Sequence, residues 1–147
     1  MKKNSPLFLI AGLFFIFDQI IKFLSRNVWL QEKTWKNLIG WHPFKNTGAA
    51  FGVPIPQPLT ITISFLILFL LIYIYIKSPD KKLGQSLGLM FVVSGAISNL
   101  LDRIFLGYTT DYLLLLTGVM NLADILIVVG FGLFIITLSR REDVYKT

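Results

Sequence analysis

The stretch LTITISFLILFLLIYIYI, residues 59–76, decides the fold of this chain, because it is long, apolar and free of charged side chains. A helix needs about 20 predominantly apolar residues, with a range of about 17–25, to cross the hydrocarbon core of a bilayer. Three other apolar stretches of similar length lie at about residues 6–24, 83–105 and 119–138. The sequence therefore predicts four transmembrane helices.

The composition of the whole chain agrees with this prediction. The 147 residues are 54% hydrophobic and 15% charged, and the mean hydropathy is +0.69. A soluble domain carries about 25% charged residues, so an ordinary soluble domain and a disordered chain are excluded. The chain has no cysteine and only one histidine, which excludes disulfides, thiolate nucleophiles and cysteine- or histidine-rich metal sites. We expect residues 1–147 to form a single polytopic membrane domain.

The N-terminal stretch MKKNSPLFLIAGLFF, residues 1–15, has the basic start and the apolar run of a secretory signal peptide. However, the polar sequence DQIIK, residues 18–22, follows where a cleavage site would need small residues. We therefore expect a first transmembrane helix that is retained.

Lysine and arginine residues predict the orientation in the membrane, because they concentrate on the cytoplasmic side. Segments 1–5, 77–82 and 139–147 contain eight basic residues in 20 positions, whereas segments 25–58 and 106–118 contain four in 47. Both termini and the 77–82 loop should therefore be cytoplasmic. The net charge of +6 is explained by this topology, so we expect no nucleic-acid partner.

The outer segment 25–58 contains no apolar stretch long enough to span a membrane. It carries Trp29, Trp35 and Trp41, and tryptophan is enriched at the membrane interface. Its middle, TWKNLIGWHPF at residues 34–44, has some β character. The predicted fold is therefore an all-α membrane protein, with four transmembrane helices and a small β-containing or interfacial element on the outer face.

The polar residues within the predicted helices lie at nearly one depth. A rise of about 1.5 Å per residue places them roughly 22–30 Å from the cytoplasmic flanks, in the outer third of the membrane core. They are Asp18, Lys22, Asn99, Asp102, Asn121 and Asp124. Ionisable residues at such positions are costly and indicate function. An ion or proton path would need polar groups through the whole membrane, and the cytoplasmic halves of these helices are almost purely apolar.

Converging carboxylates suggest a chemistry that needs neither cysteine nor histidine. Two carboxylates about 3 Å apart share one proton; the ionised one activates water and the protonated one polarises a peptide carbonyl. By depth, Asp102 and Asp124 are the natural pair. Other interpretations are interhelical hydrogen bonds that hold the bundle together, above all the Asp18–Lys22 pair four residues apart, and a divalent cation site.

A Ser-Lys hydrolase is a further alternative. Lys22 is the only lysine at this depth, and Ser94 and Ser98 lie near it. No SxxK motif or nucleophile elbow supports this interpretation.

Five motifs, in order along the chain, resemble those of the lipoprotein signal peptidases (signal peptidase II), a family of bacterial membrane aspartic peptidases. They are FDQIIKF at 17–23, NTGAAFG at 46–52, SGAISNLLDR at 94–103, TTDYL at 109–113 and MNLADI at 120–125. The sequence departs from the family pattern where Ser94 and Ser98 replace glycine and where Tyr112 and Met120 replace phenylalanine. The stretch between Asp111 and Asp124 is also shorter than is common.

The resemblance implies that Asp111 and Asp124 are the catalytic pair. One physical point agrees: Asp102 adjoins Arg103, whose charge favours an ionised Asp102, whereas no basic residue lies within seven positions of Asp111. Residues 112–138 are also too long for one span, at roughly 40 Å as a helix, so we expect their first part to fold back at the outer interface.

The remaining site residues follow from the same resemblance. Asn46 and Gly48 should hold the substrate backbone at the mouth of the site. Asn99 and Asn121 should orient nearby carboxylates and carbonyls. The pair Asp102–Arg103 should organise the site, and Asp18 and Lys22 should brace the first helix.

The implied substrate is a prolipoprotein, cut just before a diacylglyceryl-modified cysteine by a monomer surrounded by membrane lipids. We expect no cofactor and no metal. The implied location is the bacterial cytoplasmic (inner) membrane, with the active site at the outer leaflet. The alternative from another class is a small polytopic binding or transport subunit that uses its intramembrane carboxylates.

Overall fold

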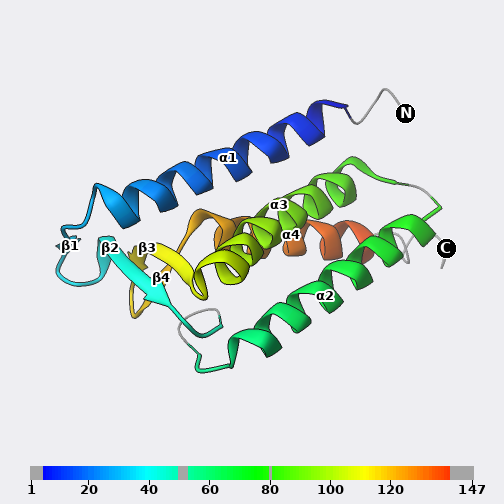
Figure 1. The fold of residues 1–147 in the computed structure, drawn as a ribbon. Helices are drawn as coiled ribbons and strands as arrows, with labels where there is room; N and C mark the ends of the chain where they lie inside the picture. The colour runs from blue at the N-terminus through cyan, green and yellow to red at the C-terminus, as the bar shows by residue number, and fades with distance from the viewer. Residues whose placement is uncertain (1–4, 50–52, 80, 140–147) are drawn as a thin grey trace.

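The computed structural model describes residues 5–49, 53–79 and 81–139. Within this part of the chain, four helices are long and apolar enough to cross a membrane. They are α1 (Ser5–Asn27), α2 (Gln57–Lys77), α3 (Leu83–Leu106) and α4 (Leu122–Ser139). The prediction of four transmembrane helices is confirmed. Figure 1 shows the α2–α3 turn, the start of α1 and the end of α4 at one end of the bundle.

A four-stranded antiparallel sheet lies at the opposite end of the helices (Figure 1). Its order is β1-β2-β3-β4, with bounds Lys33–Trp35, Ile39–Asn46, Thr109–Leu115 and Gly118–Met120. The β character expected in segment 25–58 is confirmed. The sheet also takes two strands from the segment between α3 and α4, because β2 pairs with β3 from Ile39↔Leu115 to Asn46↔Thr109.

One predicted boundary is wrong. The fourth span was expected from about residue 119, but Gly118–Met120 forms β4 and α4 begins at Leu122. The β3–β4 hairpin is the fold-back expected after Asp111. Gly107 starts this excursion: its φ of 76° is left-handed, which glycine adopts without steric cost, and it ends α3.

Helix α3 occupies the centre of the bundle and packs against the other three helices. Its contact with α4 is close, because a Cβ added to Gly88 would lie 2.6 Å from the Gly130 carbonyl oxygen. A Cβ added to Gly130 would meet the Gly88 carbonyl oxygen at 2.7 Å. Small residues allow this backbone-to-backbone approach. This contact holds the middle of α4 against the half of α3 that is remote from the sheet. The start of α4 is placed by a second close approach, because a Cβ added to Gly95 would clash with the Ala123 carbonyl oxygen.

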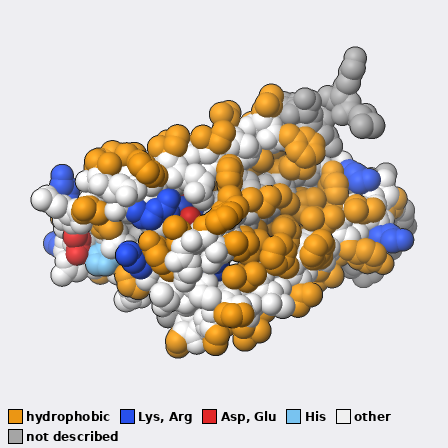
Figure 2. All heavy atoms as spheres, viewed as in Figure 1, with side chains coloured by type: hydrophobic (Ala, Val, Ile, Leu, Met, Phe, Trp, Pro, Cys, Tyr) orange, Lys and Arg blue, Asp and Glu red, His pale blue; other side chains and the backbone are white. Residues whose placement is uncertain are grey.

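The surface matches the membrane prediction. Figure 2 shows apolar side chains over the helices and charged side chains toward the two ends. On the sheet side, Trp29 and Trp35 are 50% and 64% exposed, as expected for interfacial residues. Trp41 differs, because its ring stacks on Tyr112 with centroids 5.2 Å apart.

Candidate active site

Most of the predicted site residues meet where the sheet adjoins α1, α3 and α4. This layer is polar and almost completely buried. Its members with 3% exposure or less include Asp18, Lys22, Asn46, Ser98, Asn99, Asp102, Thr110, Asp111 and Asn121.

Asp111 lies on β3 and is held by two neutral amides. Its Oδ1 accepts a hydrogen bond from Asn121 Nδ2 at 2.6 Å, and its Oδ2 accepts one from Asn46 Nδ2 at 2.9 Å. Asn46 is the last residue of β2, and the β2–β3 pairing brings it to Asp111. Burial raises the pKa of Asp111 to about 7, and the negative charge of Asp124 contributes to the rise.

Asp124 lies in the first turn of α4 and is also held by neutral donors. Its Oδ1 accepts from Asn99 Nδ2 at 2.8 Å, and its Oδ2 accepts from the Asn121 backbone N–H at 3.1 Å. In return, Asn121 Oδ1 accepts from the Asp124 N–H at 2.9 Å, a reciprocal helix cap. Asn121 therefore contacts both Asp111 and Asp124, and brings the two carboxylates to one point.

Asp18 and Asp102 are held differently, by cations. Lys22 Nζ lies 3.1 Å from Asp18 Oδ2 and 3.4 Å from Asp102 Oδ2, which confirms the predicted Asp18–Lys22 pair. Arg26 pairs with Asp102 at 3.3 Å. The Thr110 N–H donates to Asp102 Oδ2 at 2.9 Å. Asp102 therefore belongs to an ion-pair network, which argues against the Asp102–Asp124 pair that depth alone favoured.

The cations in direct contact with Asp102 are Lys22 and Arg26. The Arg103 side chain donates to the Gly48 carbonyl at 3.5 Å, while Lys22 and Arg26 pair with Asp102. Sequence reasoning missed Arg26, although its place four residues after Lys22 puts both on one face of α1.

The Ser-Lys alternative does not fit the geometry. Lys22 Nζ lies 3.2 Å from Ser98 Oγ, but it also pairs with two carboxylates. Ser98 Oγ itself donates to Asp18. The Ser98 hydroxyl therefore directs its proton to Asp18 and not to Lys22, which is the donor in its contact with Ser98.

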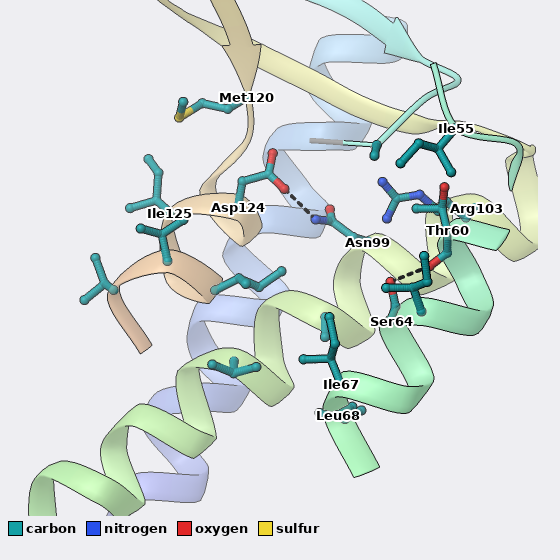
Figure 3. A pocket seen from close by; sticks show the side chains of 17 residues that line it. Ile55, Thr60, Ser64, Ile67, Leu68, Asn99, Arg103, Met120, Asp124 and Ile125 are labelled. Carbon is teal, nitrogen blue, oxygen red and sulfur yellow. Dashed lines mark hydrogen bonds between the residues drawn. The ribbon is translucent and has the colours of Figure 1, made fainter. Parts of the chain in front are cut away.

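A cavity of about 460 Å³ lies between α2, α3 and α4 and reaches one of the two carboxylates. Figure 3 shows Asp124, Asn99 and Arg103 near its sheet side, and Ile67 and Leu68 further along α2. Most of the other residues in its wall are apolar. A second cavity of about 350 Å³ is lined by Asn46, Gly48 and neighbours from the loop before α2.

Together, the fold and the site define a polytopic membrane protein with two neighbouring carboxylates, of which Asp111 is buried and Asp124 faces an apolar cavity. The family model described as "Signal peptidase (SPase) II" matches residues 10–140. This chain belongs to the signal peptidase II family, and is therefore a bacterial membrane peptidase.

Individual relatives agree with this assignment. The chain is 37% identical to the lipoprotein signal peptidase of Clostridium novyi (strain NT) over 113 residues, which cover 72% of this chain and 76% of that protein. It is 31% identical to the lipoprotein signal peptidase of Lactococcus lactis subsp. lactis over 153 residues, covering 97% and 99%.

Two solved structures share the fold. Both are bacterial membrane enzymes determined by the in meso method. One aligns with a TM-score of 0.81 at 24% identity, over 94% of this chain and 90% of that chain. The other aligns with a TM-score of 0.77 at 25% identity, over 92% and 94%.

Proposed function

We propose that this protein is an aspartic endopeptidase that removes the signal peptide of prolipoproteins just before the diacylglyceryl-modified cysteine. Asp111 and Asp124 are the catalytic pair. The observation that carries the proposal is their shared contact with Asn121, in a setting where each carboxylate accepts hydrogen bonds from neutral groups. The alternative of a binding or transport subunit is not favoured by membership of a peptidase family.

The division of roles follows from the environment of Asp111. With a pKa of about 7, Asp111 holds the shared proton and donates it to the scissile carbonyl oxygen. Asp124, half-buried at the cavity, takes a proton from the attacking water. The tetrahedral intermediate then collapses as a proton passes from the pair to the leaving amide nitrogen.

The apolar cavity between α2, α3 and α4 suits the lipid part of the substrate. Acyl chains placed along α2 and α4 remain in apolar surroundings, while the scissile bond reaches Asp124 at the polar end (Figure 3). Arg103 lines this end and is buried, and its Nε has no hydrogen-bond partner among the described residues. We assign Arg103 to a carbonyl oxygen of the substrate.

Asn46 acts on Asp111 more directly than on the substrate. Its Nδ2 donates both to Asp111 and to the Ala49 carbonyl, and its Oδ1 accepts from the Gly48 N–H at 2.9 Å. Asn46 therefore orients Asp111 and shapes the turn at Gly48. The cavity beside these two residues is the entrance for the substrate backbone.

The proposed location is the bacterial cytoplasmic membrane, with a monomer whose site faces the outer leaflet. The α2–α3 turn, rich in lysine, lies at the opposite end of the bundle from the sheet (Figure 1). Because the chain has no cysteine, a Lys81→Cys variant provides a single label site. An impermeant thiol reagent should not label it in intact cells and should label it after lysis. Labelling in intact cells would show that the orientation is the reverse of the one proposed.

The activity is tested by gel-based cleavage with purified protein in detergent. A lipidated prolipoprotein should be cut, and the same precursor with its cysteine changed to serine, which accepts no lipid, should remain intact. Equal cleavage of both precursors would contradict the proposed substrate class.

A further inference from the structure

The start of α4 is held from outside the helix. The first N–H groups of a helix have no partner within it. Here the Leu122 N–H donates to the Tyr112 hydroxyl at 2.9 Å, and the Ala123 N–H donates to Asp18 Oδ1 at 3.3 Å. The Asp124 N–H donates to Asn121. Three successive amides are thus capped from β3, from α1 and from the residue before the helix.

Tyr112 connects two of these caps. Its hydroxyl donates to Asp18 Oδ1 at 2.8 Å while it accepts from Leu122, so it joins α1 to the start of α4. The side chain is 1% exposed, and its ring stacks on Trp41 with an interplanar angle of 26°. Trp41 is fixed in turn, because its Nε1–H donates to the Trp29 carbonyl at 2.8 Å. The hydroxyl therefore has little freedom to move.

The position of Tyr112 in the chain explains why its hydrogen bond with Leu122 matters for the two carboxylates. Tyr112 directly follows Asp111, and Leu122 lies two residues before Asp124. The bond from Tyr112 to Leu122 therefore joins the strand that carries one carboxylate to the helix turn that carries the other. Tyr112 lines neither of the two cavities described above. We therefore expect it to influence the reaction without contacting the substrate.

We propose that the Tyr112 hydroxyl is a positioning group, which fixes the start of α4 to β3 through Leu122 and Asp18 and so sets the distance between Asp111 and Asp124. This inference rests on the proposed function. Phenylalanine, the residue of the family pattern at this position, lacks the hydroxyl. Ser98, which stands where that pattern has glycine, donates to the other oxygen of Asp18. The two residues that depart from the pattern, Tyr112 and Ser98, thus both donate hydrogen bonds to the Asp18 carboxylate.

A Tyr112→Phe variant tests this role, because it removes one oxygen and keeps the stacked ring. A displacement of about 1 Å at a reacting group can cost about 100-fold in rate. We expect kcat for the lipidated prolipoprotein to fall about 10- to 100-fold, with KM within about twofold of wild type. The matched control is Tyr108→Phe, whose ring packs under Lys45 at 5.2 Å, and it should leave both constants unchanged.

Amide hydrogen exchange provides a second measurement that does not depend on activity. In Tyr112→Phe, exchange should become faster at residues 122–124, while the amides in the middle of α3 should keep their wild-type protection. Unchanged exchange at 122–124 would overturn the inference, as would a wild-type kcat or a loss confined to KM. If the wild-type protein fails to cleave the precursor but Tyr112→Phe still exchanges faster at residues 122–124, the proposed function is wrong. The role of Tyr112 in fixing the start of α4 is then supported independently.

Discussion

Four carboxylates gather at one level of this molecule, and the two pairs differ in what holds them. Asp18 and Asp102 contact the cations Lys22 and Arg26 at 3.1–3.4 Å. Asp111 and Asp124 make no ion pair among the described residues and accept hydrogen bonds from amides. A cation keeps a carboxylate charged, whereas neutral donors and burial allow a pair to share a proton.

On the proposed function, this difference separates a structural pair of carboxylates from a catalytic pair within one polar layer. The first pair joins α1 to α3 and leaves its carboxylates fully engaged. The second pair joins β3 to α4, and its Asp124 faces a cavity. Asp102 and Asp124 are the same type of residue and were expected at similar depths. Their hydrogen-bond and ion-pair partners, and the cavity beside Asp124, are what distinguish them.

The largest effect should come from the amide-held pair. Asp111→Asn and Asp124→Asn should each reduce kcat by about 100- to 10,000-fold or more, because each removes half of the proton-sharing pair. Both variants should still insert in the membrane and elute as folded protein in detergent. The measurement is the cleavage rate of a lipidated prolipoprotein. Turnover above a few per cent of wild type in either variant would refute the assignment.

A substitution in the cation-held pair should lower the stability of the protein. Asp102→Asn leaves Arg26 without a carboxylate partner and leaves Lys22 with Asp18 alone. Breaking a buried ion pair costs about 3 kcal/mol or more. We expect a lower melting temperature in detergent, with activity lost in proportion to the unfolded fraction. If Asp102→Asn is stable but inactive while Asp111→Asn cleaves, the catalytic pair is Asp102 with Asp124.

A smaller loss is expected at the residue that orients Asp111. Asn46→Ala removes one of the two amides on this carboxylate and should lower kcat about 10-fold or more, since misplaced groups react slowly. Lys33→Ala and Lys36→Ala serve as controls, because both side chains are exposed, Lys33 on the edge strand β1 and Lys36 directly after it. Equal rates for all three variants would show that Asn46 does not orient Asp111.

The smallest effect is a pH dependence. Asp111 must be protonated to donate to the carbonyl, and its pKa is raised to about 7. The protonated form is therefore present below pH 7 and is lost as the pH rises through 7. Between pH 7 and pH 8, kcat/KM should fall about fivefold, as it follows the free enzyme. A flat profile from pH 6 to pH 9 would exclude Asp111 as the proton holder.

The features that the sequence predicted correctly are local along the chain. A span is recognised from about 20 consecutive apolar residues, and the Asp18–Lys22 pair from one turn of helix. The β character of residues 34–44 was likewise visible in the local sequence. The sequence also placed the polar residues at one depth, because helix rise is constant.

Only the tertiary structure decided which of these polar groups meet. Pairing of β2 with β3 brings Asn46 to Asp111 across 65 residues, and no local periodicity encodes such a contact. The β3–β4 hairpin moves the start of α4 to Leu122, so that Asn121 contacts both Asp111 and Asp124. Likewise, Arg26 reaches Asp102 because α1 packs against α3. Hydropathy determined where the chain crosses the membrane, whereas non-local strand pairing and helix packing determined which carboxylates lie close enough to be proposed as a catalytic pair.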